Sequence, residues 1–359
     1  MSDLSATRTT PQRIVGRCFL NPVTDYLLIG GGLSLVVTIV VYYRDGQKDL
    51  VSAENLPYFI LLSNFAHFAA STVRLYAKPQ AYQSLPFLTM GFPAVMLVAL
   101  TLCIAFAETL GPHVQTIYLT WSPYHYAAQA YGLAVMYSYR SGCLLGSTDK
   151  KLLWWVAMLP FFFTFFAGNN SGLDWIVGKQ TLAIDYPAAE TALTWLNEAL
   201  KYCAFVAPPL LFIKIWRSAS GPMPLIAMLA VVTNAIWWFA LDALDAFVWA
   251  TVFHGIQYMA IVMIFHVRDQ MNRPTNRRGR LYHAAGFYVM CVALGYALFR
   301  VLPLAYGFAG FGSVESALLV IAAINIHHFI VDGYIWRLKK TDGNRRIVDS
   351  GTPSVETSG

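Results

Sequence analysis

Hydrophobic residues gather in ten long segments of the chain, and shorter polar segments separate them. Each segment has about 20 residues, the length that an α-helix needs to cross the hydrocarbon core of a bilayer. The pattern predicts membrane spans at residues 24–43, 57–77, 86–107, 114–137, 152–168, 196–216, 222–241, 246–267, 282–306 and 314–336. Prolines interrupt the sixth and seventh segments, but membrane helices tolerate proline where neighbours satisfy the freed carbonyls. We therefore predict an all-α integral membrane protein, a bundle of about ten helices.

The composition supports a single membrane domain. Of the 359 residues, 57% are hydrophobic and 12% are charged, whereas soluble domains have about 25% charged residues. The net charge of +6 fits basic cytoplasmic loops, and no basic stretch with interleaved aromatic residues predicts nucleic-acid binding. The five cysteines lack CxxC spacing, so we interpret them as small buried hydrophobic residues. We expect a cytoplasmic segment at 1–23, a membrane domain at 24–337 and a disordered cytoplasmic tail at 338–359.

Lys and Arg are distributed unevenly over the loops. They collect in both termini and in the loops that follow spans two, four, six and eight. Loops after the odd-numbered spans are acidic or have few cations, and the longest is 169–195, with Trp175 and Trp195. Because Lys and Arg accumulate in cytoplasmic loops, we expect both termini on the cytoplasmic side of the cell (inner) membrane. The long outer loop is either a plain loop, an interfacial anchor or a re-entrant segment.

Five histidines lie near the middle of predicted spans. They are His67 in the second span, His125 in the fourth, His254 in the eighth, and His327 and His328 in the tenth. These spans are all even-numbered and run in the same direction. At 1.5 Å rise per residue, the five histidines share a layer about 7–8 Å thick. The remaining histidines, His113, His266 and His283, lie near the ends of spans.

This histidine layer predicts a metal site. Imidazole is the commonest side-chain metal ligand, and it binds while neutral, which avoids much of the cost of burying charge. Asp332 follows His328 by four residues, so its carboxylate would ligate the metal or orient a ligating imidazole. His327 and His328 point about 100° apart, so one of them faces the site. Tyr258, four residues after His254 at similar depth, either supports the site or forms an interhelical hydrogen bond.

Aromatic residues are crowded in several spans. Phe, Trp and Tyr make up 15% of the chain, with dense runs such as WWVAMLPFFFTFFAG and WSPYHYAAQAYG. Two interpretations fit these runs. They supply lipid-facing and interfacial packing, or they line a pocket for a long apolar, conjugated substrate.

Four short stretches are similar to motifs of a known family and occur in the same order. They are NFAHFAAS around His67, WSPYHYAAQAYG around His125, FHGIQYMAI around His254 and LVIAAINIHHFIVDGYIWR, in which His327 precedes Asp332 by five residues. Together they resemble the Brp/Blh family of membrane β-carotene 15,15′-dioxygenases. The resemblance implies a multi-pass, iron-dependent enzyme that uses O₂ on a carotenoid-like substrate.

The chain departs from the family pattern at two places. Its first span begins NPVTDYLLIGGG, without the histidine of the family's P-H-G motif, and Tyr258 replaces the second histidine of H-S-x-x-H. The leading expectation is therefore an oxidoreductase with a mononuclear or dinuclear metal, non-haem iron (Fe²⁺), and an apolar substrate that enters from lipid. His67, His125, His254 and either His327 or His328 would be ligands, and Asp332 a ligand or its support.

Three other functions fit the same residues. Two histidines on facing helices would suffice for a bis-histidine haem protein that carries electrons. A His–Asp pair within the membrane also fits the proton relay of a transporter. Finally, the chain could be a non-catalytic subunit of a membrane complex whose histidines only pack between helices. The sequence leaves protein partners open.

Overall fold

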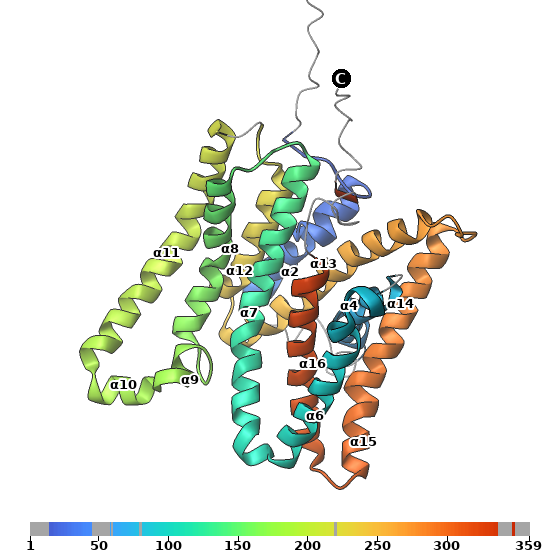
Figure 1. The fold of residues 1–359 in the computed structure, drawn as a ribbon. Coiled ribbons are helices and arrows are strands. Elements are labelled where there is room, and N and C mark those ends of the chain that lie inside the picture. Colours follow the sequence, from blue (N-terminus) through green and yellow to red (C-terminus); the bar gives the residue numbers. More distant parts are fainter. Residues whose placement is uncertain are drawn as a thin grey trace, which may run out of the picture.

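The fold is entirely helical in the part of the chain that the computed structural model describes, residues 14–44, 58, 60–78, 81–218, 221–336 and 347–348. Long helices run side by side in an elongated bundle, with α8 and α11 at one side and α14 at the other (Figure 1). Each of the ten predicted segments contains helix. The chain is thus an all-α, multi-pass membrane protein.

The helices follow one another along the chain with few long connections. In order they are α1 (Pro22–Thr24), a π-helical turn η1 (Asp25–Ile29), α2 (Gly32–Tyr43), η3 (Leu61–Phe65), α4 (Ala66–Ala77), α5 (Ala81–Ser84), η4 (Phe87–Gly91), α6 (Phe92–Ala105), α7 (Ala107–Arg140), α8 (Ser147–Ala167), α9 (Leu173–Val177), α10 (Lys179–Asp185), α11 (Pro187–Ser218), α12 (Leu225–Ala240), α13 (Ala243–Met271), α14 (Arg280–Tyr296), η5 (Ala297–Val301), α15 (Leu302–Phe308) and α16 (Ser313–Ile335).

Not every helix is long and apolar enough to count as a membrane span. Within the described ranges, six helices pass this test, or seven if the bent pair Pro22–Ile29 and Gly32–Tyr43 forms one span. The helix α12 is apolar but has only 16 residues. The helices that carry His67 and His125 do not pass, because α4 is short and α7 contains many polar residues. Helices therefore occur at all ten predicted segments, but only six or seven of the described helices pass the length and hydropathy test for a span.

Two helices begin earlier than predicted on the side of the long outer loop. The helix α7 begins at Ala107 and α11 at Pro187, so Trp195 belongs to α11 and not to a loop. The shortened connection contains α9 and α10 and is held by Asp174, whose carboxylate accepts the backbone N–H groups of Lys179 and Asn170, each at 2.6 Å. These hydrogen bonds stabilise the ionised form and lower the pKa of Asp174.

The first predicted span is broken. The two halves, Pro22–Ile29 and Gly32–Tyr43, meet at an angle of 49°. The break requires glycine, since Gly31 has a φ of +80° and an added Cβ would lie 2.3 Å from Oγ1 of Thr233 on α12. The backbone carbonyl of Ile29 is therefore at the end of a helical segment and points to side chains of neighbouring helices.

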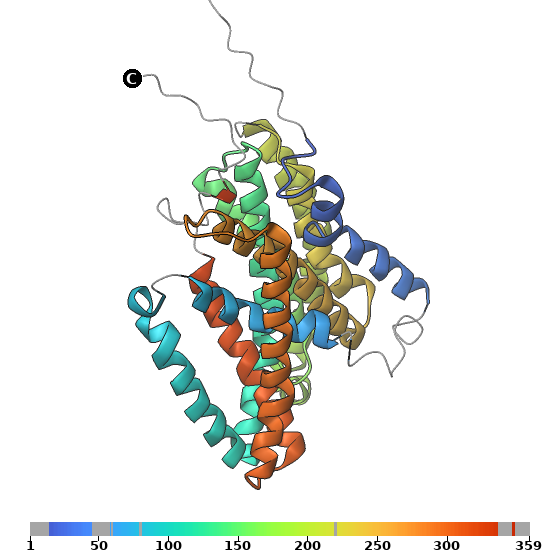
Figure 2. The same ribbon diagram turned by 90° about the vertical axis from the view of Figure 1, so that its right-hand side faces the viewer.

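Four helices form the interior of the bundle. The apolar windows of α13 and α16 are 67% and 56% buried, whereas the other candidate spans are 22–28% buried. The helix α16 packs against α4 and α7, and α13 packs against α4. The helices α8, α11 and α12 cover one side of this group, and α6 and α14 cover the other (Figures 1 and 2). The four central helices carry the predicted histidines.

Most of the predicted disordered tail, and residues 1–13 of the predicted N-terminal segment, lie outside the described residues. Ile347 and Val348 are described and are buried, at 4% and 0% exposure. Their backbone carbonyls accept hydrogen bonds from Nη1 of Arg140 at 3.4 and 3.3 Å. These two tail residues therefore belong to the folded core, contrary to the prediction of disorder.

Candidate metal centre

Four histidines from four helices meet in the middle of the bundle. His67 (α4) and His125 (α7) lie opposite each other, with His254 (α13) and His328 (α16) between them. Neighbouring ring centroids are 5.1, 4.9, 5.0 and 5.1 Å apart around the circuit 67–254–125–328. The ring centroids of His254 and His328 lie across the circuit, 6.5 Å apart, with the ring planes at 80°. We call this group the four-histidine ring; all its side chains are buried.

The structure separates the two adjacent histidines of the last span. His328 joins the four-histidine ring, but the ring of His327 stacks on Phe92 of α6, with centroids 5.0 Å apart and planes 9° from parallel. The other histidines are also elsewhere. His113 accepts a hydrogen bond from Trp175, His283 contacts Asn276, and His266 packs on Phe287. Four of the five predicted ligands are therefore brought together, and His327 is not.

Six of the eight imidazole nitrogens of this ring lack hydrogen-bond partners among the described residues. Among the described residues, none pairs with Nδ1 or Nε2 of His67, Nδ1 or Nε2 of His254, Nε2 of His125 or Nε2 of His328. Native proteins pair nearly all buried polar groups, and an unpaired one costs about 1–3 kcal/mol. Each of the four histidines thus has at least one unpaired ring nitrogen. Because an imidazole offers one nitrogen to a given ion, a bound metal ion would explain four of the six, one from each histidine.

A serine fixes the tautomer of His328. Nδ1 of His328 lies 3.1 Å from Oγ of Ser71, and that hydroxyl donates to the carbonyl of Phe68 at 3.2 Å. Because the hydroxyl proton of Ser71 is donated to the carbonyl of Phe68, Oγ of Ser71 must act as the acceptor for the Nδ1–H of His328. The proton is then on Nδ1, and Nε2 presents its lone pair to the centre, as a metal ligand must.

Asp332 adds a carboxylate to the same centre. Its Oδ1 accepts a hydrogen bond of 2.6 Å from the hydroxyl of Tyr258. Its Oδ2 lies 3.6 Å from Nε2 of His328 and 3.9 Å from Nε2 of His125, too far for good hydrogen bonds. Nε1 of Trp336 in turn donates to the Tyr258 hydroxyl at 3.4 Å. One carboxylate oxygen is therefore held in place, and the other is directed at the four-histidine ring.

The dimensions fit one metal ion. Ligand atoms of His67, His254 and His328 lie within 4.8 Å of one another, as do those of His125, His328 and Asp332. Half of the 6.5 Å between the rings of His254 and His328 is about 3.3 Å, close to the roughly 3.2 Å between a metal ion and the centroid of a ligating imidazole. Imidazoles with one carboxylate suit iron, zinc or copper. Both groups share His328, which favours one ion over two.

Small residues let the helices approach at this point. A Cβ on Gly255, next to His254, would lie 2.9 Å from Nδ1 of His67 and 3.3 Å from the carbonyl of Ser63. A Cβ on Gly295 of α14 would lie 2.7 Å from the carbonyl of Phe65. The π-helical turn Leu61–Phe65 directly precedes α4, and such turns are frequent at functional sites. Together these features bring α4 against α13 and α14 and set the position of His67.

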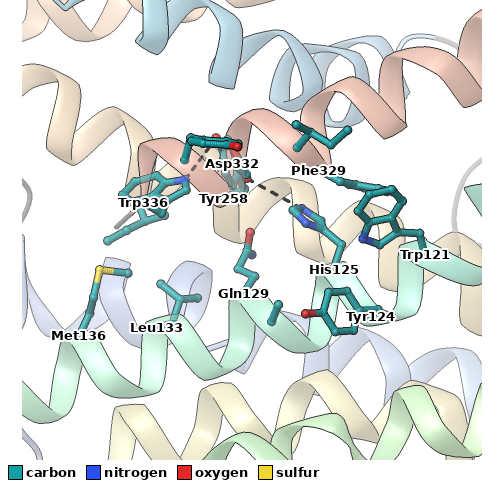
Figure 3. A pocket seen from close by; sticks show the side chains of 16 residues that line it. Trp121, Tyr124, His125, Gln129, Leu133, Met136, Tyr258, Phe329, Asp332 and Trp336 are labelled. Carbon is teal, nitrogen blue, oxygen red and sulfur yellow. Dashed lines mark hydrogen bonds and ion pairs between the residues drawn. The ribbon is translucent and has the colours of Figure 1, made fainter. Parts of the chain in front are cut away.

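A pocket of about 500 Å³ adjoins the four-histidine ring between α7, α13 and α16. Figure 3 shows His125, Tyr258 and Asp332 in its wall, with Trp121 and Phe329 towards one end and Met136 and Trp336 towards the other. The lining residues of α7, from Trp121 to Met136, extend over about 22 Å at 1.5 Å per residue. We call this the α7–α16 pocket.

The α7–α16 pocket reaches the outer face of the bundle. Tyr124 and Tyr334, which line it, are 37% and 46% exposed. Added Cβ atoms on Gly132 and Gly333, also in its wall, would meet nothing within 4 Å. Rings of the run WSPYHYAAQAYG thus line a pocket, as one of the two interpretations expects. Trp155, in the run WWVAMLPFFFTFFAG, is instead 56% exposed on α8.

Several residues of the site have no clear signal in the sequence. Ser71 and Gly255 are small residues of common kinds, and their roles depend on how closely α4 meets α16 and α13. Trp336 stands at the end of the last span, where tryptophan is usual for interfacial reasons. The sequence shows only that each lies close to a predicted site residue of the same span. Ser71 follows His67 by four residues, Gly255 directly follows His254, and Trp336 follows Asp332 by four residues.

Comparison with known proteins adds no relative. No protein-family model, no curated protein and no solved structure matches this chain.

Proposed function

We propose that this protein is a membrane-embedded oxidoreductase with one non-haem metal ion, iron, that uses O₂ on an apolar substrate. The observation that carries the proposal is the group of four buried histidines from four helices, each with an unpaired ring nitrogen, beside the carboxylate of Asp332. An apolar pocket adjoins this group. Buried donor sets of this kind are characteristic of metal sites. The adjoining pocket offers a place where a substrate can bind next to the metal.

The proposal includes a topology of ten spans with both termini on the cytoplasmic side of the inner membrane. It is supported by helices at all ten predicted segments and by Lys and Arg that alternate between the loops. In this topology α4, α7, α13 and α16 run in the same direction, and the four-histidine ring lies near the middle of the bilayer. The α7–α16 pocket then opens to the lipid acyl chains.

Each residue of the site has a defined task in this proposal. His67, His125, His254 and His328 hold the metal, and Asp332 completes the donor set and offsets the charge of the ion. When bound, iron in such a site supplies open coordination positions for O₂. Tyr258 orients Asp332 and offers a proton at its hydroxyl, 2.6 Å from the carboxylate. The aromatic and aliphatic wall of the pocket excludes water and thereby limits side reactions.

The ring geometry favours non-haem iron over haem. A haem ligated by two of these histidines would need space for a macrocycle between their rings. Instead, each ring of the four lies about 5 Å from two others, and all four side chains are buried. This spacing supports a single ion rather than a porphyrin.

The test is metal content together with an optical spectrum of the purified protein, for the wild type and three variants. We expect near-stoichiometric iron without a Soret band. We expect His67→Ala and His254→Ala to lose the metal while their circular dichroism spectra are unchanged. His327→Ala is the matched control, since it removes a half-buried histidine, adjacent in the sequence to His328, that stacks on Phe92 and not on the four-histidine ring.

Two results would overturn this proposal. The first is a protein without metal after anaerobic purification and incubation with Fe²⁺, which would leave the transporter or the packing role. The second is a Soret band that His67→Ala or His254→Ala removes, which would favour haem.

A further inference from the structure

Gln129 presents a hydrogen-bond acceptor to the α7–α16 pocket. It lies one helical turn after His125 on α7 and lines the pocket, and its amide points towards Tyr258 and His125 (Figure 3). Its Nε2 donates to Oε1 of Gln257 at 2.8 Å and to the carbonyl of His254 at 3.3 Å. Its Oε1 is buried and has no hydrogen-bond partner among the described residues.

The orientation of this amide is fixed from outside the pocket. Nε2 of Gln257 donates to the backbone carbonyl of Ile29, at the break in the first helix. Because a carbonyl only accepts, Gln257 must direct its nitrogen there, and its oxygen then faces Gln129. Gln129 must therefore direct its own nitrogen, the donor, at the oxygen of Gln257. The oxygen of Gln129 therefore cannot exchange places with the nitrogen without breaking two hydrogen bonds.

The unpaired Oε1 of Gln129 is a polar atom in a pocket wall that is mostly apolar. Most of the lining is aromatic or aliphatic, and the hydroxyl of Tyr258 already donates to Asp332. Burying an acceptor without a partner costs free energy, which a ligand recovers if it brings a donor. A neutral hydroxyl fits better than an ammonium group, because charge is expensive to bury in an apolar wall.

We propose that Gln129 selects a hydroxyl-bearing substrate, so that the ligand of the α7–α16 pocket is a long apolar alcohol. This inference rests on the proposed use of the pocket for an apolar substrate. The hydroxyl donates to Oε1 of Gln129, one helical turn (about 5.4 Å) from His125. The apolar body lies along α7, where the lining residues extend over about 22 Å. A hydrocarbon or ether of the same length leaves the amide oxygen unpaired and binds more weakly.

The experiment uses photoreactive probes and does not depend on turnover. The protein in lipid nanodiscs is exposed to a secondary alcohol of about 16 carbons, matched to the pocket length, with a diazirine near one end. Its hydroxyl is at mid-chain, because Gln129 lies about midway between Trp121 and Met136 in the lining of the pocket. Its methyl ether, which lacks the donor, is the paired probe. Labelling of the α7 and α16 peptides is measured by mass spectrometry at increasing probe concentration. We expect half-saturation at a concentration at least about tenfold lower for the alcohol.

Three variants separate the explanations. Gln129→Leu removes the acceptor and should bring the alcohol to the level of the ether, without changing the ether. Gln129→Glu, uncharged in this wall, donates to Gln257 and still offers a carbonyl oxygen, so it should keep the preference. Gly132→Phe fills the pocket and should block both probes. Circular dichroism and metal content serve as folding controls for all three.

The outcomes are distinguishable. Equal labelling by alcohol and ether in the wild type, with both blocked by Gly132→Phe, would refute the role of Gln129 and leave the pocket assignment intact. A preference for the alcohol that survives in Gln129→Leu would also refute it. Failure of either probe to label α7 and α16 would overturn the proposed use of the pocket itself.

Discussion

Replacing Gly255 with alanine tests the metal centre without removing any ligand. The added Cβ would lie 2.9 Å from Nδ1 of His67 and 3.3 Å from the carbonyl of Ser63, whereas ordinary contacts begin at 3.4 Å. Either α13 or the His67 ring must therefore move by about 0.5 Å, more than the roughly 0.2 Å tolerance of a metal–ligand distance. The His67 ring is fully buried and cannot simply swing aside.

We expect Gly255→Ala to weaken metal binding by at least about tenfold, the lower end of what misplacing a ligand costs. The assay is competition with a chelator of known affinity, followed by metal analysis of the protein fraction. Gly286→Ala on α14 is the matched control, since its Cβ would meet nothing within 4 Å. Alanine gains up to about 1 kcal/mol over glycine in a helix, so the control should keep or improve thermal stability.

The two variants together decide the question. If Gly255→Ala binds metal as tightly as Gly286→Ala, then His67 is not held in the geometry described, and a ligand role for it fails. If both variants lose metal equally, the effect is one of general helix stability. Only a selective loss in Gly255→Ala supports a metal at the contact between α4 and α13.

Further predictions concern individual side chains of the site. His328→Ala should abolish metal binding, and His327→Ala should leave it unchanged, as measured by metal analysis. Ser71→Ala frees the His328 tautomer and should weaken metal affinity about 10–100-fold; unchanged affinity would show that the serine does not orient the ligand. Tyr258→Phe removes the hydrogen bond to Asp332 and should lower metal affinity by a similar factor, measured by chelator competition. Gly132→Phe should keep the metal and abolish oxidation of any apolar substrate, and retained turnover would place the substrate elsewhere.

The helical organisation was accessible from sequence because hydrophobic length and loop charge are independent signals. Hydrophobic length and loop charge together predict the direction in which each span crosses the membrane. From these predicted directions the histidines of four spans were expected at one depth. Helix ends were predicted less well. Polar residues at the ends of α7 and α11 ended the predicted segments at 114 and 196, although the helices continue to Ala107 and Pro187.

The rotation of each helix about its own axis was not accessible. The sequence pattern leaves open whether His327 or His328 faces the site. Their neighbours on other helices decide it, since His327 stacks on Phe92 of α6 and His328 contacts Ser71 of α4. The fixed amide of Gln129 was similarly hidden, since it depends on a carbonyl that a helix break within the first span directs towards Gln257. Such features follow from contacts between segments that are distant in sequence. The hydrophobic pattern within a single span carries no information about these contacts.

The burial of Ile347 and Val348 bears on how the protein is made. These two residues share a hydrophobic cluster with Phe19 and Ile29, so segments that precede and follow the long helices meet in one core. Ribosomal synthesis delivers the helices in order, but this cluster cannot close until Ile347 and Val348 have been synthesised. Final consolidation of the bundle therefore waits for a segment that follows all the long helices in the sequence. A chain that stops before Ile347 would insert into the membrane and yet lack a carbonyl to which both Arg140 and Arg268 donate.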